Sequence, residues 1–501
     1  MFRSVRVMFT YYSRYKSTFP LADFILICAV AFLVGCGSPY SSSIDRGDSY
    51  MLNDGHPEFA LTAQPLLITN TQINLSVWVN LVQGSLIYSN SDSVQSTNIK
   101  LGENALVAPF TLSAQLFSTQ KMEKLLASAQ GNNALTAESQ SITEDQTAQQ
   151  FHLSINSVPS GNFWLRVVIT DHNSGKSTTR KIPITIKDPS IISSRPLLTS
   201  IIMSGANEER EYQPVVTYTT PARFDSLLFK TQIWSNSYDN VKLKIKLIRF
   251  KSDQKPARDL SGRNYSSSSI RYQGIDFDNT TTILSDTLSV NLSNDVSTEI
   301  SYSLKRPNIG TYRLSVSVIE NDKLVDTETR AFGVKSPWFP ALRSMRELAS
   351  PLIYLMNEKD YDKMMAINDP QELKNAYDRF WLENIGDPLT ARDVVQKYNE
   401  RVLEANKQFT NYKAGWKTDL GMIYILFGPP WYVENRGGKM KWSFAYDRDD
   451  PRYNFIFDRY RYKNKFYPFY NYRMIRDRFY FDIGYRQREL WLNGTILQRD
   501  I

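Results

Sequence analysis

The chain has 501 residues, of which 42% are hydrophobic and 22% charged, the composition of a globular protein, which excludes a globally disordered chain. A single hydrophobic core rarely grows beyond about 300 residues, so this length predicts roughly three domains. The formal net charge is +8, and two Cys and three His residues exclude a disulfide-built fold and a metal site of clustered Cys and His.

The first 35 residues are typical of a bacterial signal peptide. Basic residues precede an apolar run of eleven residues at 24–34, which is too short to span a bilayer as a helix. The run ends in Leu33-Val34-Gly35-Cys36, which resembles the bacterial lipobox. This resemblance implies that Cys36 is acylated and becomes the first residue of the mature chain.

Cysteine usage agrees with lipidation. Cys28 lies within the leader, so the mature chain keeps only Cys36 and has no internal disulfide. The alternative is that Cys36 is an ordinary buried thiol. Several acyl chains, such as palmitate, would anchor the protein stably, and the polar segment 36–57 would then be a tether.

The residues after Cys36 bear on the expected location. No acidic cluster follows Cys36 immediately, and the resemblance to other lipoproteins therefore implies an outer-membrane protein that faces the periplasm rather than the cell surface.

Two regions of alternating apolar residues, 58–188 and 189–336, predict all-β domains. Alternation is clear at 73–79 and 151–155 in the first region and at 241–248 in the second. A segment at 120–130 has helical spacing, and we interpret it as a helical crossover between sheets.

A shared sequence pattern predicts that the two β regions are copies of one unit. A Pro/Gly corner, an aromatic residue two positions on and apolar alternation occur in both: Pro159, Gly161, Phe163 and Leu165 correspond to Pro307, Gly310, Tyr312 and Leu314. This pattern resembles the late strands of an immunoglobulin-like sandwich. The alternative is coincidence between two hairpins. A sandwich fold alone says little about function.

Residues 337–501 are expected to form a third domain of α+β class, with helices at 341–410. Asp369-Pro370-Gln371-Glu372 has the form of a capping box with Pro at the first helical position. Residues 390–393 are expected to cap the next helix. The apolar stripes of both helices predict core packing rather than a cofactor site.

The most distinctive stretch of the chain follows these helices. It opens with Gly415-Trp416, continues through an apolar run at 422–428 that predicts a buried strand, and ends at Pro429-Pro430. With the helices before it, this stretch closely resembles the GWxTD domain family of Bacteroidota-type bacteria, over roughly residues 340–460. The residues that match or flank the motif are Gly415, Trp416, Thr418, Asp419, Gly428, Pro429 and Pro430.

The approach to the motif also resembles the family. The matching patches are Arg379-Phe380-Trp381, Asp387-Pro388, Tyr398, Arg401-Val402 and Ala405-Asn406. The family is known for its fold and its cellular location more than for a reaction, so the resemblance implies a domain type and not a substrate.

The tail at 437–501 is aromatic and basic. Its 65 residues hold eighteen aromatics, and fourteen Lys and Arg against eight Asp and Glu give a net charge of +6. Alternation at 455–457 and 479–483 predicts strands with aromatic residues inside and Arg outside. The alternative is a docking face for anionic lipid, acidic glycan or acidic protein, for which the candidates are Arg459, Arg461, Arg473, Arg476 and Arg478. Nucleic acid is not expected as a partner of an exported protein.

No catalytic residue, metal site or cofactor motif is predicted. Asp419 is the carboxylate in the most distinctive setting, either as an acid or base or as a turn or capping residue beside a buried Trp416. We expect an outer-membrane lipoprotein that acts as a non-enzymatic scaffold or binding module for an envelope protein or glycan. The alternative is a hydrolase-like enzyme that acts on a periplasmic polymer through a carboxylate such as Asp419.

Overall fold

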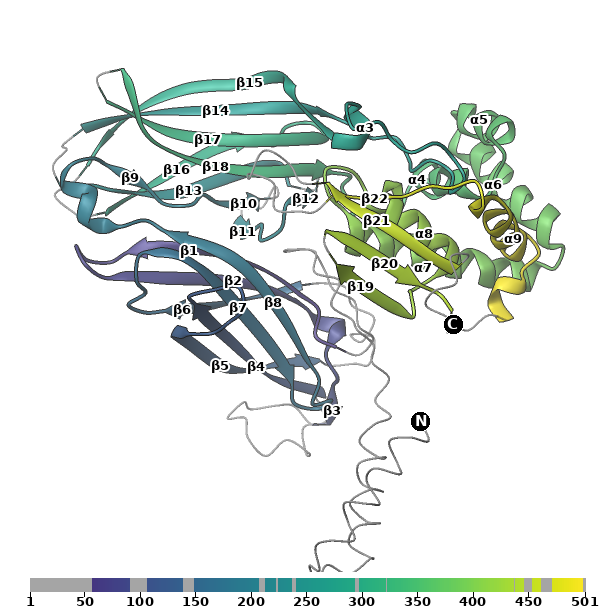
Figure 1. The fold of residues 1–501 in the computed structure, drawn as a ribbon, viewed down its shortest axis with the longest axis horizontal. Coiled ribbons are helices and arrows are strands. Elements are labelled where there is room, and N and C mark those ends of the chain that lie inside the picture. The colour runs from purple at the N-terminus through teal and green to yellow at the C-terminus, as the bar shows by residue number, and fades with distance from the viewer. Residues whose placement is uncertain are drawn as a thin grey trace, which may run out of the picture. The chain divides into compact units, whose positions relative to one another are not determined.

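The structure, a computed structural model, describes residues 56–90, 106–137, 148–206, 212–221, 224–236, 240–292, 297–320, 322–436, 438–445, 453–460 and 471–498. Five sheets and a helical region form in these ranges (Figure 1). The leader, Cys36 and Arg461 lie outside the described residues. Within those residues, no helix has both the length and the apolar character needed to cross a membrane.

The first β region contains two antiparallel sheets. One sheet has the order β1-β2-β6, and the other has the order β5-β4-β7-β8 with the short β3 beside β4. The strands are β1 (Phe59–Leu67), β2 (Ile73–Val82), β3 (Ser89–Asn90), β4 (Leu106–Phe117), β5 (Leu125–Ala137), β6 (Ala148–Ile155), β7 (Gly161–Asp171) and β8 (Ser177–Ile186). A short 3₁₀ helix, η1 (Gln83–Ser85), follows β2. Alternate residues of both sheets fill one shared core, as the period of two predicts.

The helix expected at 120–130 is wrong. The chain turns back after β4, with the Ser118 amide donating to the Lys124 carbonyl, and β5 then pairs with β4 from Leu125 onward. Met122 lies in the turn with φ of 58°, a conformation that an α-helix does not contain. Ladder pairing with β4 overrides the weak helical spacing of this segment.

The second β region also contains two sheets. One has the order β11-β10-β13-β16 with β9 beside β13, and the other has the order β12-β18-β17-β14-β15. The strands are β9 (Leu197–Leu198), β10 (Ile202–Ala206), β11 (Tyr212–Pro214), β12 (Thr219–Pro221), β13 (Ser226–Trp234), β14 (Asn240–Ser252), β15 (Ile275–Asn291), β16 (Ser297–Lys305), β17 (Gly310–Glu320) and β18 (Lys323–Lys335). The 3₁₀ helix η4 (Pro189–Ser193) leads into this region, and the short helix α3 (Ile270–Gln273) precedes β15.

Strand order repeats between the two β regions. The sheets β1-β2-β6 and β5-β4-β7-β8 have their counterparts in β10-β13-β16 and β15-β14-β17-β18. Corresponding glycines also occupy corresponding places, because Gly161 pairs with Ile186 and Gly310 pairs with Val334. The sequence echo therefore lies on equivalent hairpins of two similarly ordered pairs of sheets.

The last region combines helices with a four-stranded sheet, β19-β20-β21-β22. Its helices are α4 (Met345–Ala349), η5 (Ser350–Tyr354), α5 (Glu358–Ala366), α6 (Pro370–Ile385), α7 (Pro388–Phe409), η6 (Gly415–Lys417), α8 (Asp419–Phe427), α9 (Tyr480–Leu492) and η8 (Thr495–Gln498). Its strands are β19 (Tyr432–Arg436), β20 (Lys439–Ser443), β21 (Asn454–Tyr460) and β22 (Asn471–Met474). The molecule is thus mostly β-sheet, with a helical region toward the C-terminus.

Two helices follow the predicted core stripes. In α6 the buried residues are Leu373, Tyr377 and Trp381, and Asp369 caps the helix by accepting from the Glu372 amide.

The cap expected at 390–393 is wrong, because Asp387 caps α7 by accepting from the Thr390 amide, with Pro388 at the first position. An Asp-Pro pair therefore starts both helices.

The strand expected at 422–428 is helix α8. Every residue of α8 is buried, so its sequence shows no polar face from which a helical period can be read. A short, wholly apolar run fits a buried strand and a buried helix equally well.

The strand expected at 479–483 is also a helix, α9. Its buried residues Tyr480, Gly484, Gln487 and Trp491 follow helical spacing, whereas Phe481 is exposed. The strand expected at 455–457 is confirmed within β21.

Candidate functional site

Gly415 occupies a point where two backbones touch. A Cβ at this position would lie 1.8 Å from the carbonyl oxygen of Ala405 in α7. Gly421 in α8 is equally close to the motif backbone, because a Cβ added at Gly421 would lie 2.0 Å from the carbonyl oxygen of Gly415. Only glycine lets η6 fit between α7 and α8 this closely.

Trp416 is held by its backbone as well as by its ring. Its amide donates to Asn406 Oδ1 at 3.2 Å, and its carbonyl accepts from the Tyr354 hydroxyl at 2.7 Å. The ring is 5% exposed and meets Tyr354 edge to face, with centroids 6.1 Å apart. Trp416 therefore belongs to the core of the domain, as the sequence-based alternative expected.

Thr418 begins α8. Its hydroxyl accepts from the Gly421 amide at 3.0 Å and donates to the Gly415 carbonyl at 2.7 Å. The first bond is an N-cap, and the second closes the turn of η6 onto the start of the helix. One side chain thereby fixes the angle between the two elements.

Asp419 is fully buried and forms a two-pronged ion pair with Arg476. The distances are 2.7 Å from Nη2 to Oδ1 and 2.9 Å from Nη1 to Oδ2, and the Met474 amide donates to Oδ2 at 2.7 Å. Asp419 therefore does not itself cap α8; it ties the start of α8 to the end of β22.

Arg476 has no unused donor. Besides its bonds to Asp419, it donates to the carbonyls of Arg258, Asp259 and Met474 at 3.0 to 3.1 Å. These bonds use all five of its N–H groups. Because Arg258 and Asp259 lie between β14 and β15, the pair also fixes the β14–β15 connection against the helical region.

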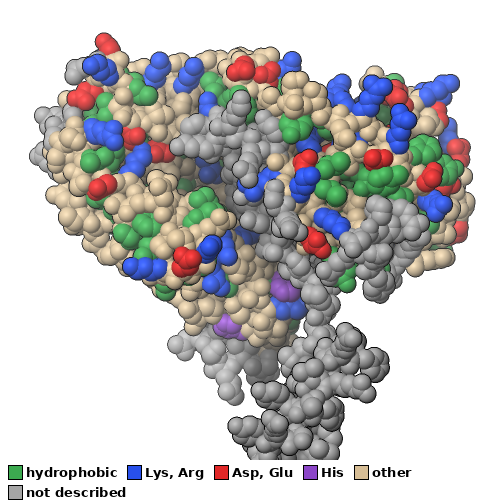
Figure 2. Space-filling view, viewed as in Figure 1, with side chains coloured by type: hydrophobic (Ala, Val, Ile, Leu, Met, Phe, Trp, Pro, Cys, Tyr) green, Lys and Arg blue, Asp and Glu red, His purple; other side chains and the backbone are tan. Residues whose placement is uncertain are grey.

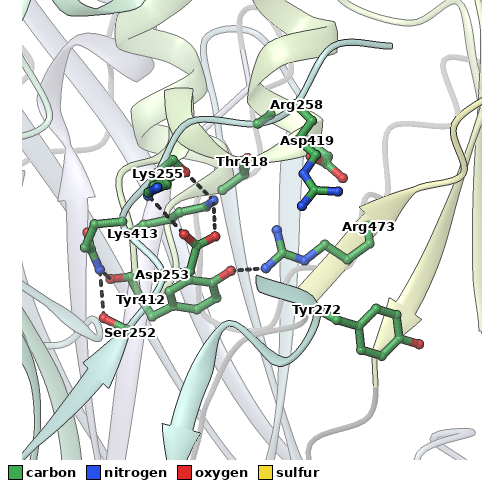
Figure 3. A network of polar contacts seen from close by, with 12 residues as sticks. Ser252, Asp253, Lys255, Arg258, Tyr272, Tyr412, Lys413, Thr418, Asp419 and Arg473 are labelled. Atoms are coloured by element: carbon green, nitrogen blue, oxygen red, sulfur yellow. Dashed lines mark hydrogen bonds and ion pairs between the residues drawn. The ribbon is translucent and has the colours of Figure 1, made fainter. Parts of the chain in front are cut away.

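A second group of polar contacts lies beside this pair (Figure 3). Lys413, which is fully buried, donates to Asp253 Oδ2 at 3.3 Å and to the Lys255 carbonyl at 2.8 Å. Arg473 donates to the Tyr412 hydroxyl. We call Asp253, Tyr412, Lys413, Arg473 and the Asp419–Arg476 pair the buried polar network.

Burial and neighbouring charges together set the protonation of this network. Burial, with the Arg473 charge, lowers the pKa of Lys413 to about 7, although Asp253 opposes the change. For Asp419, burial raises the pKa, but the charge and hydrogen bonds of Arg476 outweigh it and hold the pKa below its ordinary value. Asp419 is therefore a carboxylate at neutral pH.

The residues after the motif close the other end of α8. Gly428 ends the helix with φ of 86°, and a Cβ there would lie 2.8 Å from the Arg401 guanidinium. Arg401 donates to the carbonyls of Ile425 and Leu426 and thereby satisfies groups at the helix C-terminus. Pro429 and Pro430 follow at the surface and do not contribute to these bonds.

The five candidate basic residues do not form one exposed face. Arg473 and Arg476 are 4% and 3% exposed and belong to the buried polar network. Arg478 is exposed, Arg459 is half-buried, and Arg461 lies outside the described residues. Two of the five candidates thus stabilise the interior instead of facing a partner.

Sequence reasoning did not find the partners of the motif. Arg476 pairs with Asp419 across 57 positions, and Lys413 pairs with Asp253 across 160. No local spacing marks such pairs. Asp253, Lys413, Asp419 and Arg476 are buried, and no group of three or more His, Cys, Asp and Glu in the described ranges could hold a metal ion.

The close approach at Gly415 gives a first prediction. Gly415→Ala should lower the free energy of unfolding by about 3 kcal/mol, because the added methyl overlaps backbone that cannot move freely. Urea denaturation of the two proteins measures the change. Gly131→Ala is the control, since a Cβ there meets only side chains at 3.5 Å. Equal stability of the two variants would contradict this account of Gly415.

The ion pair gives a second prediction. Asp419→Asn should cost about 3–5 kcal/mol, because it leaves the Arg476 charge buried without its partner. Exposed Asp393 provides the control, and Asp393→Asn should change stability by about 0.5 kcal/mol or less.

The same variant has a defined pH dependence. The folded pKa of Asp419 is depressed, so its stabilisation is present above the unfolded pKa of about 3.9 and is lost as the pH falls through the folded pKa. The stability difference between parent and Asp419→Asn should stay constant from about pH 5 to 8 and shrink only in acid. A difference that already shrinks between pH 8 and 5 would contradict the pairing.

A comparison with protein-family models identifies a domain in the C-terminal part of the chain. Residues 315–493 match the family model of the GWxTD domain, a range that includes the motif, helices α4 to α9 and sheet β19-β20-β21-β22. No curated protein sequence matches the chain.

Solved structures resemble the chain only slightly. A glycosyl hydrolase family 2 member from Bacteroides cellulosilyticus is 11% identical with a TM-score of 0.21, over 52% of this chain and 26% of that chain. Red sea bream transglutaminase is 7% identical with a TM-score of 0.16, over 55% and 31%. Fibronectin(III)-like modules of CbhA from Clostridium thermocellum are 11% identical with a TM-score of 0.14, over 55% and 91%.

The chain spans about a third or less of the length of the first two structures, and none of the three likenesses carries an argument about function. The family match is different, because it covers the residues whose geometry explains the motif. Residues 315–493 of the chain are therefore a GWxTD domain.

Proposed function

We propose that this protein is an outer-membrane lipoprotein that acts as a non-enzymatic scaffold or binding module for an envelope protein or glycan. One observation carries the choice of binding over catalysis. Asp419, the carboxylate on which a hydrolase would depend, is fully buried and has both oxygens bonded to Arg476. An acid or base must reach its substrate and exchange a proton near neutral pH. The burial of Asp419 weighs against the first requirement, and its lowered pKa weighs against the second.

The proposed anchor is Cys36. The apolar run and the lipobox-like residues before Cys36 support acylation, for example with palmitate, and the polar segment after it supports a flexible tether. The absence of an acidic cluster immediately after Cys36 favours a periplasm-facing position.

We also propose that the two β regions are immunoglobulin-like sandwiches. The matching strand orders of the two regions support this. A further support is the Tyr312 hydroxyl near the start of β17, which donates to the Asn308 carbonyl at 2.7 Å. A tyrosine bonded to backbone a few residues upstream is typical of that fold. Phe163 occupies the corresponding place in the first region and lacks the hydroxyl.

The face of the molecule shown in Figure 2 offers a partner mixed charge rather than one basic field. In Figure 2, Lys and Arg side chains are interspersed with Asp and Glu over the face shown. Interspersed charges favour specific contacts over general attraction to anionic polymers. Of the candidate basic residues, Arg459 and Arg478 remain accessible to a partner.

A pull-down tests binding against catalysis. The tagged chain, solubilised from membranes in detergent, should retain an envelope protein or glycan through a high-salt wash and should not degrade periplasmic polymer. A polymer-degrading activity that disappears in a folded Asp419→Asn variant would overturn the proposal in favour of a hydrolase.

The anchor gives a third prediction. Cys36→Ala should move the protein from the outer-membrane fraction to the soluble fraction, because acylation needs the thiol. Fractionation followed by immunoblotting measures the change. Cys28→Ala is the matched control, since Cys28 lies within the leader, and it should leave the protein in membranes. A Cys36→Ala protein that stays with outer membranes after a high-salt wash would rule out lipid as the main anchor.

A further inference from the structure

A cavity of about 520 Å³ lies where the second β region meets the helical region. Strand β14 contributes Arg249 and Lys251, the end of β18 contributes Lys335, and η6 contributes Trp416 and Lys417. The GWxTD motif thus forms part of its wall, and Lys417 is the variable residue of the motif. The volume falls within the range of sites for small ligands.

The cavity is lined by four cationic side chains, Arg249, Lys251, Lys335 and Lys417, and by one acidic side chain, Glu347. Glu347 is engaged elsewhere, since its Oε2 accepts from the amides of Arg343 and Ser344 at 3.1 and 3.0 Å at the start of α4. Among the described residues no ion pair joins Glu347 to any of the four cations of the wall.

Lys335 is the least expected of these cations. It is 7% exposed, and in the described part of the chain no hydrogen bond or ion pair to its ammonium group is found. The charges that act on its pKa are those of the like-charged Lys417 and Lys413. A buried cation without a partner is destabilising, and an anionic ligand would supply the missing opposite charge.

Lys417 faces the same space. It is half-buried, its ammonium lies 5.3 Å from the centre of the Trp416 ring, and no carboxylate in the described ranges pairs with it directly. The Trp416 ring steadies this cation through its electron-rich face but does not neutralise it. Two ammonium groups, one from β18 and one from η6, thus lie at one cavity without a paired anion.

We propose that this cavity binds the carboxylate or phosphate of a small ligand between Lys335 and Lys417. Arg249 and Lys251, which are exposed on β14, attract the anion at the rim. Among the neutral polar residues of the wall, Asn279 and Thr281 are exposed and can bond hydroxyl groups of the same ligand. The inference deepens the binding role proposed above, but it does not depend on the lipid anchor.

Protonation agrees with an anionic ligand. Burial, with Lys417 and Lys413 nearby, lowers the pKa of Lys335 to about 7 in the free protein. A bound anion favours the charged amine and raises this pKa, so binding takes up a proton above pH 7. Affinity should therefore be greatest at about pH 6 and should fall as the pH rises above 7. The charged groups that face Lys335 or its neighbours are Arg249, Lys251, Asp253, Glu347, Lys413 and Lys417.

The first experiment uses the purified full chain in detergent and three probes: inorganic phosphate, glucuronate and uncharged glucose. At about 10 mM, phosphate or glucuronate should raise the melting temperature and glucose should not, because only a ligand that binds the folded state stabilises it. Stabilisation by phosphate alone assigns a phosphate ligand, and stabilisation by glucuronate alone assigns a carboxylate. No shift with either anion, or an equal shift with glucose, would overturn the proposal.

The second experiment is a fourth prediction and uses Lys335→Met. This variant should fold and melt at the same or a higher temperature than the parent, since it replaces an unpaired buried cation by an apolar side chain of similar length. Calorimetric titration with the stabilising anion should show about tenfold weaker binding or worse, the loss expected for one charge-assisted bond.

Lys244→Met is the matched control. Lys244 is exposed on the same strand as Arg249 and Lys251 but does not line the cavity, so this variant should bind like the parent. Unchanged affinity in Lys335→Met would overturn the proposal, because it would show that Lys335 does not contact the ligand. An equal loss of affinity in Lys244→Met would also overturn it, because it would show that the anion is attracted by charge in general and not by this site. Either failure leaves membrane anchoring through Cys36 untouched.

Discussion

The ion pair between Asp419 and Arg476 is the contact on which this part of the structure depends. It joins the start of α8, the end of β22 and the β14–β15 connection in the interior, where neither side chain is exposed. Burying two charges is favourable only when every donor and acceptor is satisfied. Here Arg476 uses all five donors, and the Met474 amide completes the Asp419 side. The motif therefore marks a junction between chain segments that are distant in sequence.

Each named residue of the motif makes a contact that fixes the geometry of this junction. Gly415 admits the α7 backbone, Trp416 anchors the turn to Tyr354, Thr418 caps α8 and Asp419 binds Arg476. In this chain the motif residues fix a turn against two helices. This explains why the motif identifies a domain without identifying a reaction. The variable position is different, since Lys417 faces a cavity where its charge is available to a ligand.

The buried cations of this structure are of two kinds, those paired within the protein and those without an acidic partner in the described residues. The tail is rich in Arg, but Arg473 and Arg476 are buried in the polar network and serve the interior. Lys335 is buried too, yet it has no acidic partner in the described residues and lines the cavity. A paired buried cation is explained by the fold, whereas an unpaired one points to something outside the chain. On this argument the proposed binding site is the cavity and not the aromatic tail.

The sequence by itself determined the GWxTD domain, the β-rich composition of the first two regions, the equivalence of the hairpins at Gly161 and Gly310, and the start of α6 at Asp369. These features depend on local patterns: a motif with fixed spacing, alternation of period two and a capping residue. Tertiary structure decided the rest. Residues 420–427 are apolar throughout, so only packing on all sides made α8 a helix instead of a strand. Likewise, Arg476 and Lys335 differ from the surface cations of the tail only in what the folded chain places around them, and no local spacing encodes a contact made across many tens of residues.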